Sequence, residues 1–210
     1  MTSIQKKAKE NQVSELLVNS IEFIEDGHLY LYDGVLSPSV SQILQFINPN
    51  KYKGIPQQIL SAKAQFGTNV HKAIENHEQG IDNDLSMMEQ LTFEKYLELR
   101  EEHEIRPVVQ EQLVSYYGRY CGTLDMVADV KYYRCLVDIK TTAQVDVESL
   151  AWQLGMYKLA YEEMYGVKLH TCYCLWLPKK GLGKLIEIIP KTKKQIEEML
   201  DQYEEHNSEQ

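Results

Sequence analysis

A carboxylate and an ammonium group lie close together in the segment CLVDIK (135–140). The segment is apolar and rich in branched side chains, which predicts a buried β-strand. Because side chains alternate along a strand, Asp138 and Lys140 share one face with Leu136, and Ile139 lies on the other. Taken alone, an Asp-x-Lys pair is best explained as a salt bridge at the end of a strand, a common and weak interaction.

Asp125 supplies a second carboxylate, in the middle of the apolar segment GTLDMVAD (122–129). A carboxylate in that position is costly unless it is paired or binds a metal. A short turn joins this strand to the next, so Asp125 and Asp138 can face each other across neighbouring strands. Two such carboxylates repel unless a cation lies between them, and oxygen-rich sites suit Mg²⁺ or Mn²⁺. With Lys140 to bind a phosphate, or to orient and deprotonate a water, these groups suit metal-assisted phosphodiester hydrolysis.

Two further residues are candidate ligands of the same metal. Glu111 shares a strand face with Val109 and Leu113, so it is either a buried third acidic ligand or a residue whose register differs from the prediction. The sequence favours neither alternative. His71 lies on an earlier helical segment, where Gly67 allows close approach of the helix. A lone histidine is most often an ordinary surface or core residue, but imidazole is also a ligand for Mn²⁺ or Mg²⁺.

Polar and basic residues later in the chain are candidates for holding a nucleic-acid strand. Gln153 and Tyr157 lie four residues apart in a helical segment, and the simplest explanation of the pair is helix patterning with Tyr157 in the core. Six lysines then fall within sixteen residues that contain one acid, Glu187, which indicates either a track for phosphates or a solvated hairpin. These lysines are Lys179, Lys180, Lys184, Lys191, Lys193 and Lys194.

The elements that must position these residues follow from periodicity and turn signals. Asp26-Gly27 between apolar runs predicts a β-hairpin, and the acidic strands form part of a three-stranded antiparallel meander with two more strands later. We expect helices over about 40–47, 57–78, 85–104 and 147–165, and a last helix capped by Thr192 with Gln195. The order predicts one α/β domain over 1–210, with a central mixed sheet flanked by helices and with about 1–15 and 205–210 flexible.

Length and composition exclude several classes of protein. The chain has 210 residues, of which 43% are hydrophobic and 25% charged, so it is not a wholly disordered chain. Its net charge of −9 argues against non-specific coating of duplex DNA, so any nucleic-acid contact must be local or helped by bound cations. No apolar run of about 18 residues and no signal peptide are apparent, which predicts a soluble protein with no membrane partner, located in the cytoplasm.

The four cysteines are typical of reduced strand residues. They are Cys121, Cys135, Cys172 and Cys174, and no two of them form a C-x-x-C pair. Cys172 and Cys174 are two residues apart and share one face of a strand. A zinc or iron–sulfur site requires a better-spaced set.

The order of these motifs resembles that of the PD-(D/E)xK nuclease superfamily. The motifs are G-T-N-V-H (67–71), Glu111, G-T-L-D (122–125), D-I-K (138–140) and Q-L-G-M-Y (153–157). Each motif is weak alone, but the five in the correct order and context are a strong signal. The chain most resembles the RecB-like exonucleases, including many phage-type recombination nucleases, over roughly residues 37–180.

The resemblance implies a restriction-endonuclease-like fold and cleavage of DNA that depends on Mg²⁺ or Mn²⁺. It assigns roles to residues that match the motifs. The implied metal ligands are His71, Asp125, Asp138 and the backbone carbonyl of Ile139, and Glu111 is an extra acid for a second metal. Lys140 is the implied catalytic lysine. Gln153 and Tyr157 match the element that helps to hold the DNA strand. Lys179 and Lys180 join these as DNA-binding candidates because of their charge.

The chain also departs from some relatives. Asp138 stands where many of them carry Glu, although Asp is common in this branch. Relatives with an iron–sulfur cluster need one cysteine ahead of the nuclease motifs, and none precedes Cys121, so no cluster is expected. There is no G-x-x-x-x-G-K-[ST] loop, and hence no helicase motor. The nuclease therefore acts alone, as an oligomer, or with a recombination partner protein, and the sequence leaves these open.

The leading hypothesis is a divalent-metal-dependent exonuclease that acts on linear DNA ends. Its expected role is DNA recombination or repair, or phage DNA processing, in a bacterial cell or as a phage-encoded enzyme. The alternative is a catalytically silent nuclease-fold module that binds DNA or a partner protein, and a third hypothesis is an enzyme acting on RNA. A silent copy should have lost Lys140 or one of the acids, and this chain keeps them all.

Overall fold

The computed structural model describes residues 21–208, so the expectation for residues 1–15 lies outside the described part of the chain. The main sheet is mixed, as predicted, and its strands follow the chain in the order β4 (Ile105–Ser115), β5 (Cys121–Val130), β6 (Tyr133–Lys140), β7 (Cys172–Trp176) and β8 (Lys184–Ile188). All neighbouring strands are antiparallel except β6 and β7, which are parallel. The predicted antiparallel meander corresponds to β4, β5 and β6.

The helices agree closely with the hydrophobic periodicity. They are α2 (Val40–Ile47), α3 (Gln57–Glu78), α4 (Met87–Glu102), α5 (Val147–Tyr165) and α6 (Lys193–Ser208). Capping boxes begin α2 at Ser39 and α6 at Thr192, where the side chain of Gln195 accepts a hydrogen bond from the Thr192 backbone. We expected residues 205–210 to be flexible, but 205–208 form the last turn of α6. No helix of the described residues has the length and apolar character to span a membrane.

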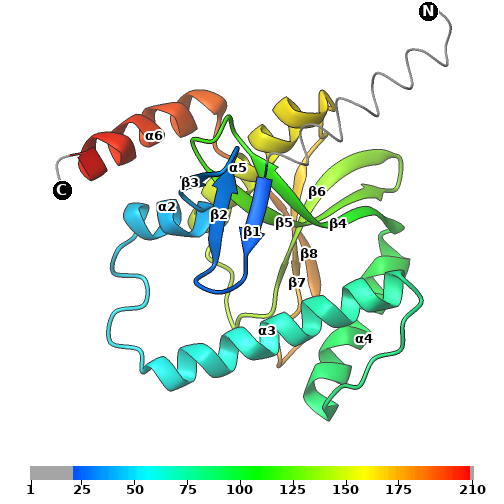
Figure 1. The fold of residues 1–210 in the computed structure, drawn as a ribbon. Coiled ribbons are helices and arrows are strands. Elements are labelled where there is room, and N and C mark those ends of the chain that lie inside the picture. Colours follow the sequence, from blue (N-terminus) through cyan, green and yellow to red (C-terminus); the bar gives the residue numbers. More distant parts are fainter. Residues whose placement is uncertain (1–20, 209–210) are drawn as a thin grey trace, which may run out of the picture.

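Helices cover both faces of the main sheet (Figure 1). Side chains of α2, α5 and α6 pack with Leu136 and Leu124 on one face, and side chains of α3 and α4 pack with Val137 and Ile139 on the other. Neighbouring residues of β6 therefore belong to opposite cores, which confirms the predicted alternation along CLVDIK. The structure is a mixed α/β arrangement consistent with a PD-(D/E)xK nuclease fold.

A second, smaller sheet lies beside the meander. It is made of β1 (Ile21–Ile24), β2 (Leu29–Tyr32) and β3 (Val35–Ser37), all antiparallel. The predicted hairpin is confirmed as β1 and β2, whereas β3 was not predicted. Tyr30 of β2 attaches this sheet to β5, because its hydroxyl lies 3.0 Å from the Thr123 hydroxyl.

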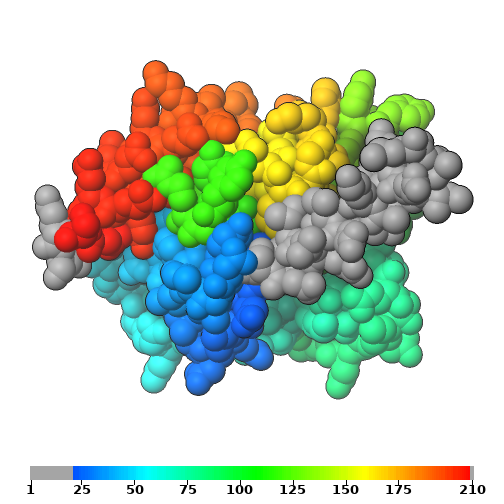
Figure 2. All heavy atoms as spheres, turned by 45° about the horizontal axis from the view of Figure 1, so that its top comes forward, coloured from blue at the N-terminus to red at the C-terminus, as the bar shows by residue number. Residues whose placement is uncertain are grey.

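The loop between β4 and β5 is held against α6. Arg119 of this loop forms ion pairs of 2.7 Å with both Asp201 and Glu204. In Figure 2 this loop (green) lies directly beside α6 (red). Ion pairs as well as apolar packing therefore attach the β4–β5 loop to α6.

Candidate active site

Three carboxylates lie in one row across β4, β5 and β6. The β4–β5 pairs on either side of this position put Glu111 opposite Asp125. The β5–β6 register, extended by one pair beyond Met126 and Val137, puts Asp138 opposite Asp125. Residues directly opposite each other in antiparallel strands have neighbouring side chains. The sequence prediction that Asp125 and Asp138 face each other therefore agrees with the register.

The backbone at Glu111 departs from regular strand geometry. Its φ is 47°, in the left-handed region that residues other than glycine seldom adopt. Its side chain is exposed, so the expectation of a buried Glu beside Val109 and Leu113 was wrong. The β4–β5 register shifts between Pro107 and Val109 and is regular from Val109 onward, so the left-handed backbone at Glu111 itself accounts for its departure from simple alternation.

A cluster of three potential metal ligands surrounds this position. His71, Glu111 and Asp125 each offer one ligand atom, and these atoms all lie within 4.8 Å of one another. His71 comes from α3, which approaches the end of β6 closely: a side-chain carbon added at Gly67 would lie 3.3 Å from the Thr141 hydroxyl oxygen. The predicted close approach at Gly67 is thus present.

Hydrogen bonds orient two of the three residues. Nε2 of His71 lies 3.1 Å from the carbonyl oxygen of Ile139, and a carbonyl can only accept, so this nitrogen carries a proton. In the neutral ring Nδ1 then keeps its lone pair, and it lies 3.7 Å from Oδ1 of Asp125. The other oxygen of Asp125 accepts a hydrogen bond of 2.7 Å from the backbone N–H of Ile139. The backbone of Ile139 thus holds the imidazole and the carboxylate together.

Asp138 and Lys140 form an ion pair next to this cluster. Asp138 is only 2% exposed, and Nζ of Lys140 lies 2.9 Å from its Oδ1 and 2.7 Å from its Oδ2. Burial raises the pKa of Asp138 to about 6, with the Lys140 charge acting against this and the Asp125 charge adding to it. Burial lowers the pKa of Lys140, but the charges of Asp138 and Asp125 outweigh it and raise this pKa overall.

The simple salt-bridge explanation of Asp-x-Lys is therefore only partly correct. The salt bridge exists, but its carboxylate is buried, whereas an ordinary pair at a strand end is exposed. Asp138 is not part of the 4.8 Å ligand cluster, so its role as a metal ligand, like that of the Ile139 carbonyl, stays a prediction.

The donor set fits a hard divalent cation. Although Glu111 is exposed as a whole residue, the surrounding protein removes water from its carboxyl group, and this desolvation, followed by the Asp125 charge, raises the pKa of Glu111, while the His71 charge lowers it. Carboxylates that raise one another's pKa are stabilised as anions when a cation binds between them. Carboxylate oxygens with one imidazole suit Mg²⁺ or Mn²⁺.

Tyr157 and Gln153 line different pockets on the sheet edge. Tyr157 packs over Gly122, where an added side-chain carbon would lie 2.7 Å from the tyrosine ring. Burial and the Asp125 charge raise the pKa of Tyr157 well above its ordinary value. The core interpretation of Tyr157 is therefore confirmed, although the residue also lines a pocket that contains Glu111. Gln153 lines a neighbouring pocket with Lys140.

The predicted track of six lysines is divided by the fold. Lys179 places its ammonium 3.7 Å from the centre of the Phe66 ring, and Lys179 and Lys180 line a pocket of about 350 Å³. The last three lysines instead form ion pairs with acids of α5 and α6: Lys191 with Glu148, Lys193 with Glu163 and Lys194 with Glu198. These ion pairs disfavour a single continuous track over all six lysines.

Several residues near the site were not predicted from the sequence. Lys51, Tyr52 and Lys53 of the loop between α2 and α3 lie in pockets that also contain Lys140, and so does Lys63 of α3. The signal was present as KYKG (51–54), where basic residues alternate with an aromatic one in a loop.

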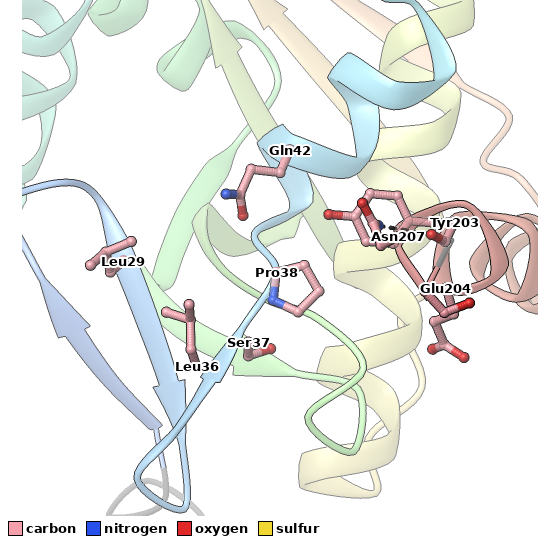
Figure 3. A pocket seen from close by; sticks show the side chains of 9 residues that line it. Leu29, Leu36, Ser37, Pro38, Gln42, Tyr203, Glu204 and Asn207 are labelled. Carbon is pink, nitrogen blue, oxygen red and sulfur yellow. Dashed lines mark hydrogen bonds between the residues drawn. The ribbon is translucent and has the colours of Figure 1, made fainter. Parts of the chain in front are cut away.

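A separate pocket of about 460 Å³ lies between the small sheet and α6 (Figure 3). Leu29, Leu36 and Pro38 face Tyr203 and Asn207 across it. None of the metal-ligand candidates lines this pocket, so it is distinct from the acidic row.

Comparisons with known proteins place the chain in a family. A family model described as the PD-(D/E)XK nuclease superfamily matches residues 75–209, a range that contains the acidic row and Lys140 but not His71. No curated protein matches. A solved structure described as "Crystal structure of SSO0001" is similar with 11% identity and a TM-score of 0.44, over 95% of this chain and 84% of that chain. Because the family model covers more than half of the chain, this protein belongs to the PD-(D/E)XK nuclease superfamily.

Proposed function

We propose that the protein is a DNA exonuclease that depends on Mg²⁺ or Mn²⁺ and hydrolyses phosphodiester bonds at the ends of linear DNA. The observation that carries the proposal is the ligand cluster of His71, Glu111 and Asp125 beside the buried Asp138–Lys140 pair. Members of this superfamily are in general metal-dependent nucleases. The complete set of acids and the lysine speaks against the silent-module alternative.

The residues that would hold the metal are Nδ1 of His71 and the carboxylates of Glu111 and Asp125, with Asp138 and the Ile139 carbonyl as further proposed ligands. When bound there, a divalent ion would supply Lewis-acid polarisation of the scissile phosphate and activation of a water nucleophile. The hydrogen bond from the Ile139 N–H fixes Asp125, so this carboxylate needs little reorganisation when a cation arrives.

Lys140 is the proposed catalytic lysine. Its raised pKa means that it is protonated at neutral pH, which suits orienting a water and offsetting negative charge on the phosphate in the transition state. Asp138 holds the ammonium in place through both of its oxygens. The ammonium form of Lys140 cannot accept a proton, so Lys140 could deprotonate the water only after losing a proton of its own, which its raised pKa opposes.

The exonuclease assignment is finer than the family membership. It is supported by the resemblance to the RecB-like branch and by the net charge of −9, which disfavours binding along duplex DNA. The proposed role is DNA recombination or repair, or phage DNA processing, inside the cell, alone or with a partner protein.

The test is digestion of end-labelled linear DNA and closed circular DNA with Mg²⁺, Mn²⁺ or EDTA. We expect linear DNA to be degraded with either metal, circles to be spared, and EDTA to stop the reaction. Full activity in EDTA would contradict the metal site, and rapid nicking of circles would indicate an endonuclease. Binding without cleavage under all conditions would favour the silent module, and faster digestion of RNA than of DNA would change the substrate.

A further inference from the structure

Positive charge is distributed unevenly over this acidic protein. Many of its cations pair with carboxylates within the described part of the chain, as Arg100 does with Glu78 and Arg134 with Asp129. In contrast, the exposed side chains of Lys53, Lys63 and Lys180 form no ion pair with any residue that the structure describes. Cations without a carboxylate partner keep their charge available for an external anion.

These lysines lie in three adjoining pockets. The first, of about 690 Å³, contains Lys51 and Lys53. It shares Tyr52 and Lys140 with the second, of about 520 Å³, which in turn shares Lys63 with the third, where Lys179 and Lys180 lie. Consecutive pockets share lining residues and therefore adjoin one another, and we call the three together the basic groove.

The lining of the basic groove is selective in its charge. Six lysines line it: Lys51, Lys53, Lys63, Lys140, Lys179 and Lys180. No Asp or Glu of the described chain lines any of its three parts, although the protein has 31 acids and 22 Lys and Arg. A depression lined by one sign of charge concentrates ligands of the opposite sign.

Two aromatic residues accompany the lysines. Tyr52 is 58% exposed and lies where the first two parts meet, next to Lys140. Phe66 lies in the third part beneath Lys179. A positively charged groove with an exposed aromatic ring is typical of sites that bind single nucleic-acid strands, because the lysines follow the phosphates and a base stacks on the ring.

The loop between α2 and α3 is anchored at this position. Nζ of Lys51 lies 3.0 Å from a carboxylate oxygen of Asp146 and donates a hydrogen bond of 2.8 Å to Ser149, at the beginning of α5. This contact holds the loop beside Gln153 and leaves Lys53 free. The groove wall is therefore built from α2, α3 and α5 together.

We propose that the basic groove is the path of one DNA strand across the active site, from Lys53 past Lys140 to Lys63, Lys179 and Lys180. Lys53 and Lys63 bind phosphates on the two sides of Lys140, and Tyr52 stacks on a base. This inference rests on the proposed nuclease function and names the residues that hold its substrate.

The test is binding of a labelled single-stranded DNA oligonucleotide, measured by fluorescence anisotropy in EDTA so that cleavage does not interfere. We expect the Lys53→Ala/Lys63→Ala double variant to bind about tenfold more weakly or worse. The slope of log affinity against log salt concentration should fall by about 0.7 for each lysine lost. Tyr52→Ala should weaken binding at least about fivefold with an unchanged salt slope, because stacking carries no charge.

The control for the double variant loses the same number of positive charges, so both variants have the same net charge. Lys131→Ala/Lys168→Ala removes two exposed lysines that line no part of the groove, and Tyr132→Ala removes a tyrosine that is 92% exposed. These variants should bind as the unaltered protein does. Equal weakening by the two lysine pairs would overturn the groove, because net charge alone would then explain it. The groove proposal would also be overturned if the protein and all its variants bound duplex DNA more tightly than single-stranded DNA, and by the same factor.

Failure of the groove and failure of the nuclease assignment are distinguishable. If the protein cleaves DNA with Mn²⁺ but the Lys53→Ala/Lys63→Ala variant binds as well as the controls, the groove is wrong and the nuclease stands. If no metal supports cleavage but only the groove variants lose binding, the groove is correct and the proposed catalytic function is wrong.

Discussion

Lys140 and Asp138 can be separated by mutation at the residue scale. Lys140→Ala keeps every proposed metal ligand, so Mn²⁺ should still bind, whereas cleavage should fall about a hundredfold or more because a charge-stabilising group is lost. Stability should also fall, by about 3 kcal/mol, because Asp138 is left buried without its partner. Calorimetric Mn²⁺ titration, digestion and thermal unfolding of the same sample measure these effects.

Asp138→Asn is the control for this variant. It removes a proposed ligand charge but leaves a side chain of the same shape, so it should lose metal affinity and cleavage together. If Lys140→Ala loses stability while it cleaves at a nearly normal rate, the pair is a structural salt bridge only.

Glu111 allows charge and backbone strain to be tested separately. Glu111→Gly and Glu111→Ala both remove the carboxylate, so both should weaken Mn²⁺ binding to the same extent. With a φ of 47°, glycine avoids the steric cost that alanine keeps, so the Gly variant should be more stable by about 1 kcal/mol. Urea unfolding in EDTA compares the two. Equal stability would show that this backbone geometry is not retained in the variants.

The acids and the lysine of the site could be predicted because each has a local signal. Asp125 and Asp138 interrupt apolar strands, and a short turn fixes their pairing. The twist at Glu111 could not be predicted, because a left-handed residue within a strand depends on its surroundings and no glycine marks it. Lys53 and Lys63 were missed because an exposed lysine acquires a role only from what lies opposite it in the fold.

At the scale of elements, the C-terminal end of α3, which lies after His71 in the chain, is attached to α4. Glu78 of α3 accepts hydrogen bonds from Tyr96 at 2.7 Å and from Arg100 at 2.7 and 3.0 Å. Burial raises the pKa of Glu78, but the hydrogen bonds from Arg100 and Tyr96 outweigh it and lower this pKa overall. The ionised carboxylate is therefore the form that stabilises the helix pair.

This geometry predicts a pH-dependent loss of stability. A lowered folded-state pKa gives stability that is present above the unfolded value, about 4.3, and is lost as pH falls through the folded value. Glu78→Gln should cost about 2 kcal/mol at pH 7 and progressively less below pH 4. Thermal unfolding from pH 3 to 7 measures the difference. Glu198→Gln, which removes an exposed partner of Lys194, is the control and should change stability little.

The elements with the strongest periodicity were the ones best predicted. α5 has the predicted bounds, since Asp146 caps its start and Gly166, with a φ of 64°, ends it. β3 was missed because two of its three residues, Val35 and Leu36, are exposed and show no buried alternation. Sequence patterns report burial, so a short exposed strand that is held by its neighbour leaves no pattern.

At the scale of the whole molecule, net charge was informative but incomplete. The value of −9 predicts that any nucleic-acid surface is local, but it does not say where such a surface would lie. Lys191 and Lys193 pair with acids of α5, whereas Lys53, Lys63 and Lys180 pair with no acid of the described residues. Only the tertiary structure distinguishes the two groups, because the pairing acids are distant in sequence.

The row of acids on the meander also bears on the order of folding. β4, β5 and β6 are consecutive in the chain, so Glu111, Asp125 and Asp138 meet through short loops, whereas His71 must arrive with α3 from an earlier part of the chain. Contacts between residues near in sequence form faster than distant ones. We therefore expect the three carboxylates to come together before α3 docks and adds His71, so that a divalent ion can meet the carboxylates before the site is complete.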